Sequence, residues 1–220
     1  MNSHRIVLGI SGASGASIGV RIAELLRATG SAEVHLVVSP AGERTLAHEV
    51  GADALDRLKA CVARHYQVND IGAAIASGSF ATGGMIIAPC SMRTLACVAT
   101  GVTDNLLTRA ADVHLKERRR LVLIARESPL HLGHLRAMVA ATECGAIIAP
   151  PVPSYYLAPR SAADITDQIA RRAIDLLDVI TPRLSLAWDG TKDLRTGVVS
   201  AQPTVIKTVS SSFNGPSQCS

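Results

Sequence analysis

Aromatic residues are scarce in this 220-residue sequence, which contains one tryptophan, three tyrosines and two phenylalanines. Proteins that bind single-stranded nucleic acid stack the bases on aromatic side chains, so this scarcity argues against such a partner. The formal net charge is +4, but acidic residues are interspersed with the basic ones. We therefore expect an anionic small molecule, such as a phosphate ester, and no nucleic acid.

Patterns typical of metal sites and membrane spans are also missing. The five cysteines form no CxxC pair and no cysteine–histidine cluster with metal-ligand spacing, which predicts reduced thiols and no metal site. No apolar run approaches the roughly 20 residues needed to cross a bilayer, and the N-terminus lacks the pattern of a signal peptide. These absences predict a cytoplasmic protein without a membrane partner.

Short aliphatic runs are what the sequence does contain. RIVLGI (5–10), EVHLVV (33–38), MIIA (85–88) and LVLIA (121–125) predict buried strands, and segments with helical periodicity follow them. The alternation predicts an α/β fold with a parallel sheet. We expect one domain over residues 1–180 and a C-terminal extension, partly flexible, over residues 181–220. The segment 54–76 is the least informative, and Arg64, His65 and Tyr66 are interpreted as surface residues.

Small polar residues follow several of these strands. SGASGAS (11–17) comes after the first, Ser39 and Pro40 after the second, and a predicted turn of Pro89, Cys90 and Ser91 after the third. Ligands gather at the carboxyl ends of parallel strands, where the N–H groups at helix N-termini bind phosphate. The sequence therefore predicts an anion-binding edge, although each loop alone is also consistent with a tight turn that has no ligand.

The segment 108–130 combines the basic run KERRR with the strand 121–125 and ends in a polar turn. One interpretation is a solvated basic helix end before a buried strand. The other is that the strand places Arg126 and Glu127 at the ligand edge.

Other reactive residues receive structural interpretations. Cys90 has no histidine or acid beside it in the sequence, so we expect a small buried residue and no nucleophile. His131 and His134 share a predicted helix face but lack a third metal ligand, so we expect local packing. The proline-rich loop 150–160 is predicted to bring Tyr155 and Tyr156 to the same carboxyl edge as a pocket wall. Ser161 is predicted to cap a last helix that ends near Asp178, and Trp188 to anchor the tail.

Four longer segments are informative when taken together: GISGASGASIGVRIAELL (9–26), SGSFATGGMIIAPCSMRTLA (77–96), LLTRAADVHLKERRRLVLIARESPLHLGHL (106–135) and GAIIAPPVPSYYLAP (145–159). Together they resemble the flavin prenyltransferases of the UbiX family, including the small subunits of phenolic acid decarboxylase systems. The similarity covers roughly residues 5–180.

The resemblance implies a Rossmann-like (flavodoxin-like) three-layer fold with a central parallel sheet, assembled as a homododecamer. It implies a metal-independent enzyme that transfers a dimethylallyl group from dimethylallyl monophosphate to N5 and C6 of reduced FMN. The sequence leaves open whether a monophosphate or a diphosphate is the donor. The prenylated FMN would serve as cofactor for a partner decarboxylase of the UbiD family.

The resemblance also implies roles for individual residues. Glu127 matches the acid/base residue, Ser14 lies near N5 of the flavin, and Glu49 is a second carboxylate of the site. The implied FMN-binding residues are Gly12, Ala13, Ser14, Ser39, Ser91, Thr94 and Arg126. The implied residues for the prenyl phosphate are Lys116, Arg126, Tyr156 and Arg172, with Arg109 at a subunit junction.

These residue types suit the implied chemistry. Departure of a phosphate from an allylic carbon develops negative charge on oxygen, which lysine and arginine donors stabilise when water is excluded. Ring closure at C6 requires a base to remove a proton, a role for Glu127 or for the released phosphate.

Three other functions remain open. A flavin-dependent cysteine decarboxylase of related fold would use an early histidine and an asparagine-bearing loop, where this chain has APCSMRTL (88–95). A non-catalytic FMN carrier would not need the cluster of Lys116, Arg126, Glu127 and Tyr156. A direct aromatic acid decarboxylase would need a decarboxylating constellation that the sequence does not display.

Overall fold

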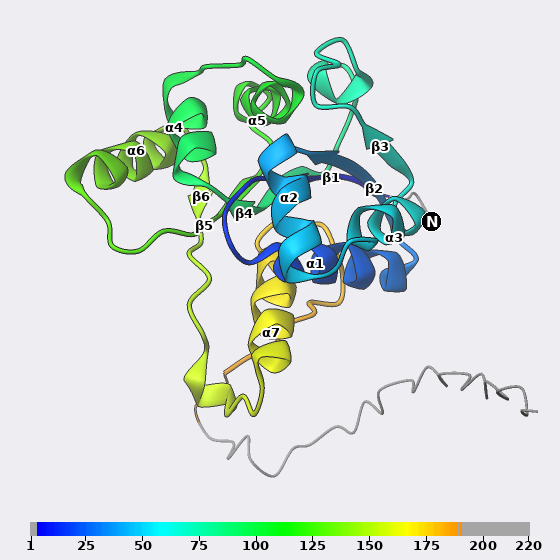
Figure 1. Cartoon of the computed structure of the whole chain (residues 1–220), viewed down its shortest axis with the longest axis vertical. Helices are drawn as coiled ribbons and strands as arrows, with labels where there is room; N and C mark the ends of the chain where they lie inside the picture. The colour runs from blue at the N-terminus through cyan, green and yellow to red at the C-terminus, as the bar shows by residue number, and fades with distance from the viewer. Residues whose placement is uncertain (1–3, 189, 191–220) are drawn as a thin grey trace, which may run out of the picture.

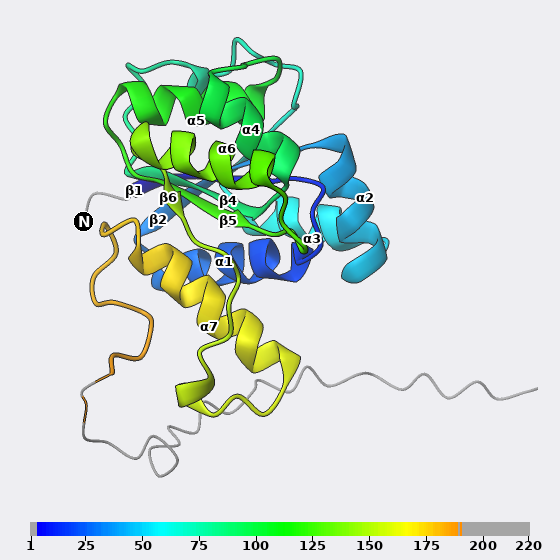
Figure 2. The same cartoon turned by 90° about the vertical axis from the view of Figure 1, so that its left-hand side faces the viewer.

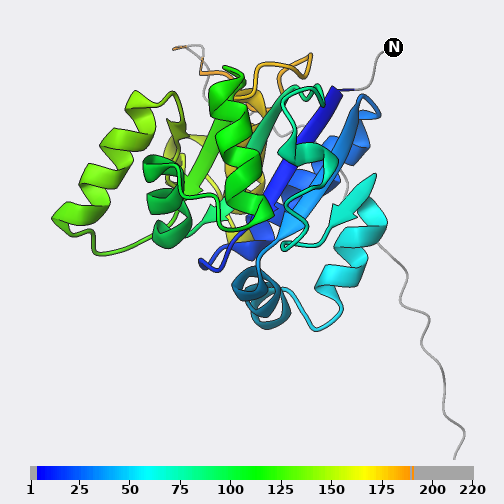
Figure 3. The same cartoon turned by 90° about the horizontal axis from the view of Figure 1, so that it is seen from above.

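The protein is described by a computed structural model that covers residues 4–188 and residue 190. Six strands form one parallel sheet in the order β3-β2-β1-β4-β5-β6. Figure 3 shows the strands running in one direction beneath the helices. The strands are β1 (His4–Ile10), β2 (Ala32–Val38), β3 (Arg64–Tyr66), β4 (Gly84–Cys90), β5 (Leu121–Ala125) and β6 (Ile147–Ile148).

Helices cover both faces of the sheet, which confirms the three-layer α/β fold. Helices α1 and α7 pack together on one face, and α4, α5 and α6 lie on the other (Figure 2). The helices are α1 (Ala16–Thr29), α2 (Pro40–Glu49), α3 (Ala54–Cys61), α4 (Met92–Thr100), α5 (Leu106–Lys116), α6 (Leu132–Glu143) and α7 (Ala162–Asp175), with short 3-10 turns η1 (Ala74–Ala76) and η2 (Tyr155–Leu157).

The strands are buried on both sides because helices cover both faces. In β1, Ile6, Leu8 and Ile10 pack toward α1 and α7, whereas Val7 packs into the core on the other face. Every residue of β5 is buried. This two-sided burial explains why the strands are continuous aliphatic runs, as the sequence predicts.

The strand order reverses at β1, so the loop after β1 lies at the point of reversal. The chain moves from β1 to β2 on one side and later returns to β4 on the other side of β1. In open α/β sheets a ligand binds where the order reverses, at the carboxyl ends of the strands. The fold therefore favours a site beside the carboxyl ends of β1 and β4.

Several predicted boundaries were wrong. Pro89 and Cys90 belong to β4 and do not form a turn, and α7 ends at Asp175 and not near Asp178. Tyr66, in β3, is not a surface residue, because it is only 4% exposed. Its hydroxyl oxygen lies 2.9 Å from Nδ1 of His35. Its burial depends on a partner 31 residues earlier in the chain, so the local sequence gives no signal for it.

The chain after α7 packs back on that helix. Ile180 is buried, and Leu184 packs against the core on the α1 and α7 side. The proposed extension beyond residue 190 lies outside the described residues, so the boundary at residue 181 stays a prediction. No helix among the described residues is long and apolar enough to cross a membrane.

Candidate active site

The loops after β1 and β4 are joined at the carboxyl edge of the sheet. The buried hydroxyl of Ser11 donates to the carbonyl oxygen of Pro89 at 2.9 Å and accepts from the N–H of Ser91 at 2.7 Å. The N–H of Arg126, directly after β5, donates to the carbonyl oxygen of Cys90 at 3.1 Å. These bonds hold three consecutive loops of the edge in one arrangement, and the first residue of SGASGAS supplies the central contact.

Helices α2 and α4 begin at this edge with serine caps. The Ser39 hydroxyl accepts from the N–H of Gly42 at 3.0 Å, and the Ser91 hydroxyl accepts from the N–H of Thr94 at 3.3 Å. The hydroxyls of Ser91 and Thr94 are 3.1 Å apart. The remaining N–H groups of a first turn have no acceptor within their helix, and the helix dipole adds positive potential there. Both termini are therefore suited to bind an anion.

Helix α1 begins differently because Glu49, from the end of α2, caps it. Its N-cap residue, Gly15, has a φ of 107° and no capping side chain. Oε2 of Glu49 accepts from the N–H groups of Gly15 and Ala16, each at 2.8 Å. The sequence did not reveal this capping role.

The Glu49 carboxylate is stabilised in its charged form. Partial burial acts to raise the pKa of Glu49, but hydrogen bonds from Ser14, Gly15 and Ala16 and the positive charge of Arg126 lower this pKa below its ordinary value. Ser14, Glu49 and Arg126 therefore interact at one place on the edge. Glu127 is exposed beside them, and its Oε1 accepts from the N–H of Ser128 at 3.0 Å.

The backbone of the first loop approaches α2 closely. A Cβ atom on Gly12 would lie 2.4 Å from Cβ of Ala41, so no larger residue fits without displacement. Between β1 and α1, Gly12 and Ser14 are exposed and Gly15 is partly exposed, so serine is the largest residue on the open side of the loop. A ligand is thus able to reach the backbone of this loop without obstruction by large side chains.

Lys116 lies away from this edge, which corrects the prediction that it sits beside Arg126 and Glu127. It is the last residue of α5, pairs with Glu117, and its Nζ lies against Gly78 before β4. Helix α5 runs back antiparallel to β5, and five strand residues at about 3.3 Å each separate the two edges by roughly 16 Å. One chain therefore does not bring Lys116 to Arg126.

Two arginines of the basic run, Arg119 and Arg120, hold neighbouring segments together, whereas Arg118 is exposed. Arg119 donates to the carbonyl oxygens of Phe80, at 2.9 Å, and Gly78. Arg120 donates to the carbonyl oxygen of Leu176 at 3.0 Å. These two arginines thus hold the segments around the amino edge together.

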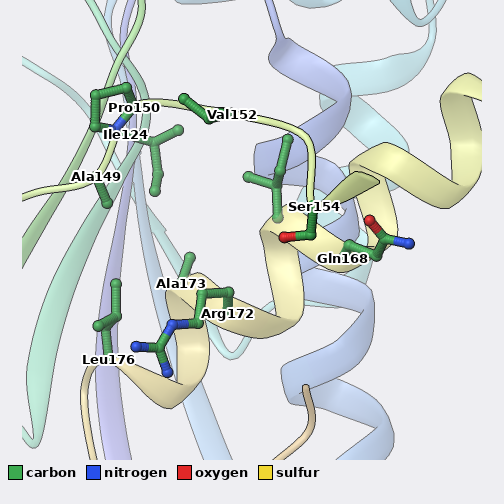
Figure 4. A pocket seen from close by; sticks show the side chains of 10 residues that line it. Ile124, Ala149, Pro150, Val152, Ser154, Gln168, Arg172, Ala173 and Leu176 are labelled. Atoms are coloured by element: carbon green, nitrogen blue, oxygen red, sulfur yellow. The ribbon is translucent and has the colours of Figure 1, made fainter. Parts of the chain in front are cut away.

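The loop after β6 forms an arm beside α7 and does not line the carboxyl edge as predicted. It leaves the sheet after β6 and lies next to the first half of α7 (Figure 1). Val152 and Ser154 of the arm do line a cavity of about 70 Å³ with residues of α7 (Figure 4). Tyr156 is 54% exposed at the tip of the arm.

Arg172 also lines this cavity, whereas the neighbouring Arg171 does not. The Nε of Arg171 donates to Asp167 at 2.6 Å and its Nη1 to the carbonyl oxygen of Leu184 at 3.3 Å. Figure 4 shows the Arg172 guanidinium among the side chains that line the cavity. The helical register, which the sequence did not reveal, therefore leaves Arg172 available for a ligand.

Comparisons with known proteins decide the family. The family model described as Flavoprotein matches residues 1–182. The flavin prenyltransferase UbiX of Thauera aromatica is 52% identical over 175 residues, which are 80% of this chain and 89% of the relative. This chain belongs to the flavin prenyltransferase (UbiX) family.

Solved structures of UbiX proteins have the same fold. AnUbiX (PadA1), solved with FMN and dimethylallyl pyrophosphate, is 42% identical with a TM-score of 0.81 over 87% of this chain and 100% of its own. A dodecameric FMN-dependent Ubix-like decarboxylase from Escherichia coli O157:H7 is 38% identical with a TM-score of 0.80, over 84% of this chain and 100% of its own. These matches confirm the flavodoxin-like fold that the UbiX resemblance implied.

The rival cysteine decarboxylases share only the fold. An FMN-dependent cysteine decarboxylase from thioviridamide biosynthesis is 17% identical to this chain, with a TM-score of 0.59. The identity to UbiX proteins is higher over most of the chain, so the comparisons do not favour a cysteine decarboxylase function.

Cys90, His131 and His134 have the structural roles that the sequence predicts. Cys90 is fully buried, and burial raises the pKa of its thiol far above the ordinary value, so it is no nucleophile. His131 caps α6 by accepting from the N–H of Gly133 at 3.0 Å, and its ring stacks on that of His134. The described residues contain no group of three or more histidine, cysteine or acidic side chains that would bind a metal ion.

The residues that UbiX membership implies thus fall into separate groups within one chain. The carboxyl edge holds Gly12, Ala13, Ser14, Ser39, Glu49, Ser91, Thr94, Arg126 and Glu127. Tyr156 and Arg172 lie at the arm, and Lys116 lies at the opposite edge. Arg109, on α5, pairs with Asp112 at 2.8 Å.

Proposed function

We propose that this chain is a flavin prenyltransferase that transfers a dimethylallyl group from dimethylallyl monophosphate to reduced FMN. The observation that carries the proposal is the meeting of Ser14, Ser39, Ser91 and Arg126 at the carboxyl edge, in a chain that is 52% identical to a UbiX enzyme. When bound, reduced FMN supplies the electron-rich N5 and C6 positions to which the prenyl group is joined.

The carboxyl edge fits FMN. The first turns of α2 and α4, capped by Ser39 and Ser91, suit its phosphate because their N–H groups and dipoles favour an anion. Ser14 and Arg126 offer exposed donors for the polar edge of the flavin ring. Gly12, Ala13 and Thr94 complete the proposed cofactor site by leaving room for the ring and its phosphate.

Three side chains are proposed to act on the reacting groups. Glu127 removes the proton released on ring closure, since it is exposed at the edge and pairs with no cation among the described residues. Ser14 would lie near N5 of the flavin. Glu49 remains ionised, holds the first turn of α1, and orients the hydroxyl of Ser14.

A second copy of the chain is proposed to complete the site. Lys116 and Arg126 lie at opposite edges of one chain, and the cavity beside Arg172 and the arm has a volume of only about 70 Å³. Ligand pockets usually enclose about 300–1,000 Å³, so neither half is a complete donor site. Assembly into a dodecamer, as in the Escherichia coli relative, would bring Lys116, Arg172 and Tyr156 to the prenyl phosphate, with Arg109 at the junction.

The cations then stabilise the leaving group. Negative charge develops on the phosphate oxygen as the allylic C–O bond breaks, and Lys116 and Arg172 donate to that oxygen in a site from which assembly excludes water. The exposed hydroxyl of Tyr156 donates to the same phosphate. We propose that the prenylated FMN passes to a UbiD-family decarboxylase and that the protein works in the cytoplasm.

Mass spectrometry tests the reaction directly. Purified protein is incubated anaerobically with FMN, dithionite and dimethylallyl monophosphate, and a parallel sample receives the diphosphate. We expect a flavin heavier by one prenyl unit in at least one sample and none when FMN stays oxidised. The proposal fails if neither donor yields that mass. Glu127→Gln should bind FMN normally but form product more slowly, and unchanged turnover would remove Glu127 from the acid/base role.

Mixed oligomers test the shared site. Lys116→Met and Arg126→Gln should each be inactive alone, because each removes one half of every site. Co-expressed with different affinity tags and purified through both tags, the two variants should regain part of the activity, since some sites then combine an intact Lys116 with an intact Arg126. Inactive mixed oligomers would show that the two residues do not act in one shared site.

A further inference from the structure

The end of the described chain is bound to α7 through one buried carboxylate. Asp175, the last residue of α7, is only 4% exposed. Its Oδ1 accepts from the N–H of Leu184 at 2.7 Å, and its Oδ2 accepts from the N–H of Ser185 at 2.8 Å and from the Ser185 hydroxyl. The mechanism proposed above does not use this carboxylate.

Arg171 adds a second bond to the same segment. Its Nη1 donates to the carbonyl oxygen of Leu184 at 3.3 Å while its Nε is held by Asp167. Residues 184 and 185 are therefore fixed on the surface of α7 at both N–H and carbonyl groups. Three residues further on, the chain reaches Trp188, and an extended chain of that length spans at most about 11 Å.

Trp188 in turn contacts Tyr156 on the arm. The two ring centroids are 5.6 Å apart with an interplanar angle of 71°, an edge-to-face arrangement. Trp188 is 60% exposed and Tyr156 is 54% exposed, so burial in the core holds neither ring in place. The position of Trp188 depends instead on the nearby attachment at Ser185, and the orientation of the Tyr156 ring depends on Trp188.

We propose that Asp175 is a positioning residue that holds Trp188 against Tyr156 and thereby orients the tyrosine for the prenyl donor. The inference rests on the proposed function, in which Tyr156 contacts the donor phosphate. Asp175 touches neither FMN nor the donor and acts only through residues 184–188. The segment after α7 is then a brace for the arm, and its attachment sets how well the donor binds.

The test uses Asp175→Asn in the full-length protein. An asparagine keeps the size of the side chain, but its NH₂ group opposes the N–H donors of residues 184 and 185. We expect KM for dimethylallyl monophosphate to rise about tenfold, the factor that corresponds to about 1.4 kcal/mol, which is near the upper end for an edge-to-face aromatic pair. The value of kcat and the affinity for FMN should stay within about twofold of the wild-type values.

A spectroscopic signal separates this role from a general structural one. Trp188 is the single tryptophan of the chain, so its fluorescence reports only on this contact. In Asp175→Asn the emission should shift to longer wavelength and acrylamide should quench it more strongly. Asp178→Asn is the matched control, because Asp178 is exposed and pairs only with Arg120 and Arg183 among the described residues.

A double-mutant cycle shows whether Asp175 acts through Trp188. Trp188→Ala should raise KM by a similar factor, and the double variant should equal either single variant, because both remove the same support of Tyr156. Additive effects, or an Asp175→Asn protein with unchanged KM and fluorescence, would overturn the proposal. So would a fall in kcat and FMN affinity with KM unchanged.

Two further measurements keep the test decisive. If Asp175→Asn does not fold, Ser185→Ala removes one of the three hydrogen bonds and should give smaller changes in the same direction; no change in KM or emission would contradict the proposal. If the wild-type protein forms no prenylated flavin, the proposed function fails, and the fluorescence of Asp175→Asn still decides whether Asp175 holds Trp188.

Discussion

Glu49→Gln is expected to destabilise the protein through the start of α1. The Glu49 carboxylate accepts two backbone N–H bonds of 2.8 Å, replaces a missing N-cap side chain, and places negative charge at a helix N-terminus. Hydrogen bonds to charged groups contribute about 1.5–3 kcal/mol each when buried, and the helix dipole contributes about 0.3–1 kcal/mol. Since Glu49 is exposed, solvent screening reduces these values. We expect a loss of about 1 kcal/mol in unfolding free energy at pH 7.

The loss should depend on pH in a defined direction. The pKa of Glu49 is lowered in the folded protein, from an ordinary value of 4.5. The carboxylate of Glu49 is therefore protonated more readily in the unfolded chain than in the folded one. Its contribution to the unfolding free energy is complete well above pH 4.5 and disappears as pH falls through the folded pKa. Urea unfolding of wild type and Glu49→Gln at pH 7 and at pH 3.5 measures the difference, which should shrink at the lower pH.

Glu143→Gln provides the control. Glu143 is exposed at the last position of α6, where a negative charge opposes the helix dipole, so its removal should leave stability unchanged or slightly higher. Equal losses for the two variants at pH 7, or a loss in Glu49→Gln that persists undiminished at pH 3.5, would refute the capping role of the Glu49 carboxylate.

Two further predictions concern a buried histidine and a close backbone contact. Burial lowers the pKa of His114 from 6.5 to about 4 in the folded protein. As pH falls, the unfolded chain therefore binds a proton at this histidine before the folded chain does. Between pH 7 and pH 5 the wild type should lose about 2 kcal/mol more unfolding free energy than His114→Gln. Identical pH profiles in urea titrations would contradict this. Gly12→Ala should lose about 1–3 kcal/mol by overpacking, because the new Cβ would lie 2.4 Å from Ala41. Gly72→Ala, whose new Cβ would have only Asp70 within 4 Å, at 3.8 Å, should be close to neutral in thermal unfolding, and equal melting temperatures for both variants would refute the argument.

The sheet could be predicted because its strands carry their own signal. The strand 121–125 is buried on both faces and is therefore aliphatic at every position, with charged residues on either side. The loops after the strands could be placed at one edge for the same reason, since parallel strands all end there. Ser39 and Ser91, which follow two of these strands, cap the helices that begin there.

What the sequence did not reveal depends on contacts between distant segments. Tyr66 is buried by its contact with His35, and Glu49 caps a helix that begins 33 residues earlier. The path of the arm carrying Tyr156 depends on its packing against α7, which comes later in the chain. Such pairings arise from tertiary structure, so no local pattern of residue types predicts them.

The segment 108–130 shows how a short separation in sequence becomes a long one in space. Lys116 and Arg126 are ten positions apart, yet the strand between them crosses the sheet and places them at opposite edges. In the proposed mechanism both residues contact one phosphate, and a single chain does not allow this. The proposed donor site therefore depends on assembly, so Lys116→Met should impair donor use while leaving FMN binding at the carboxyl edge intact.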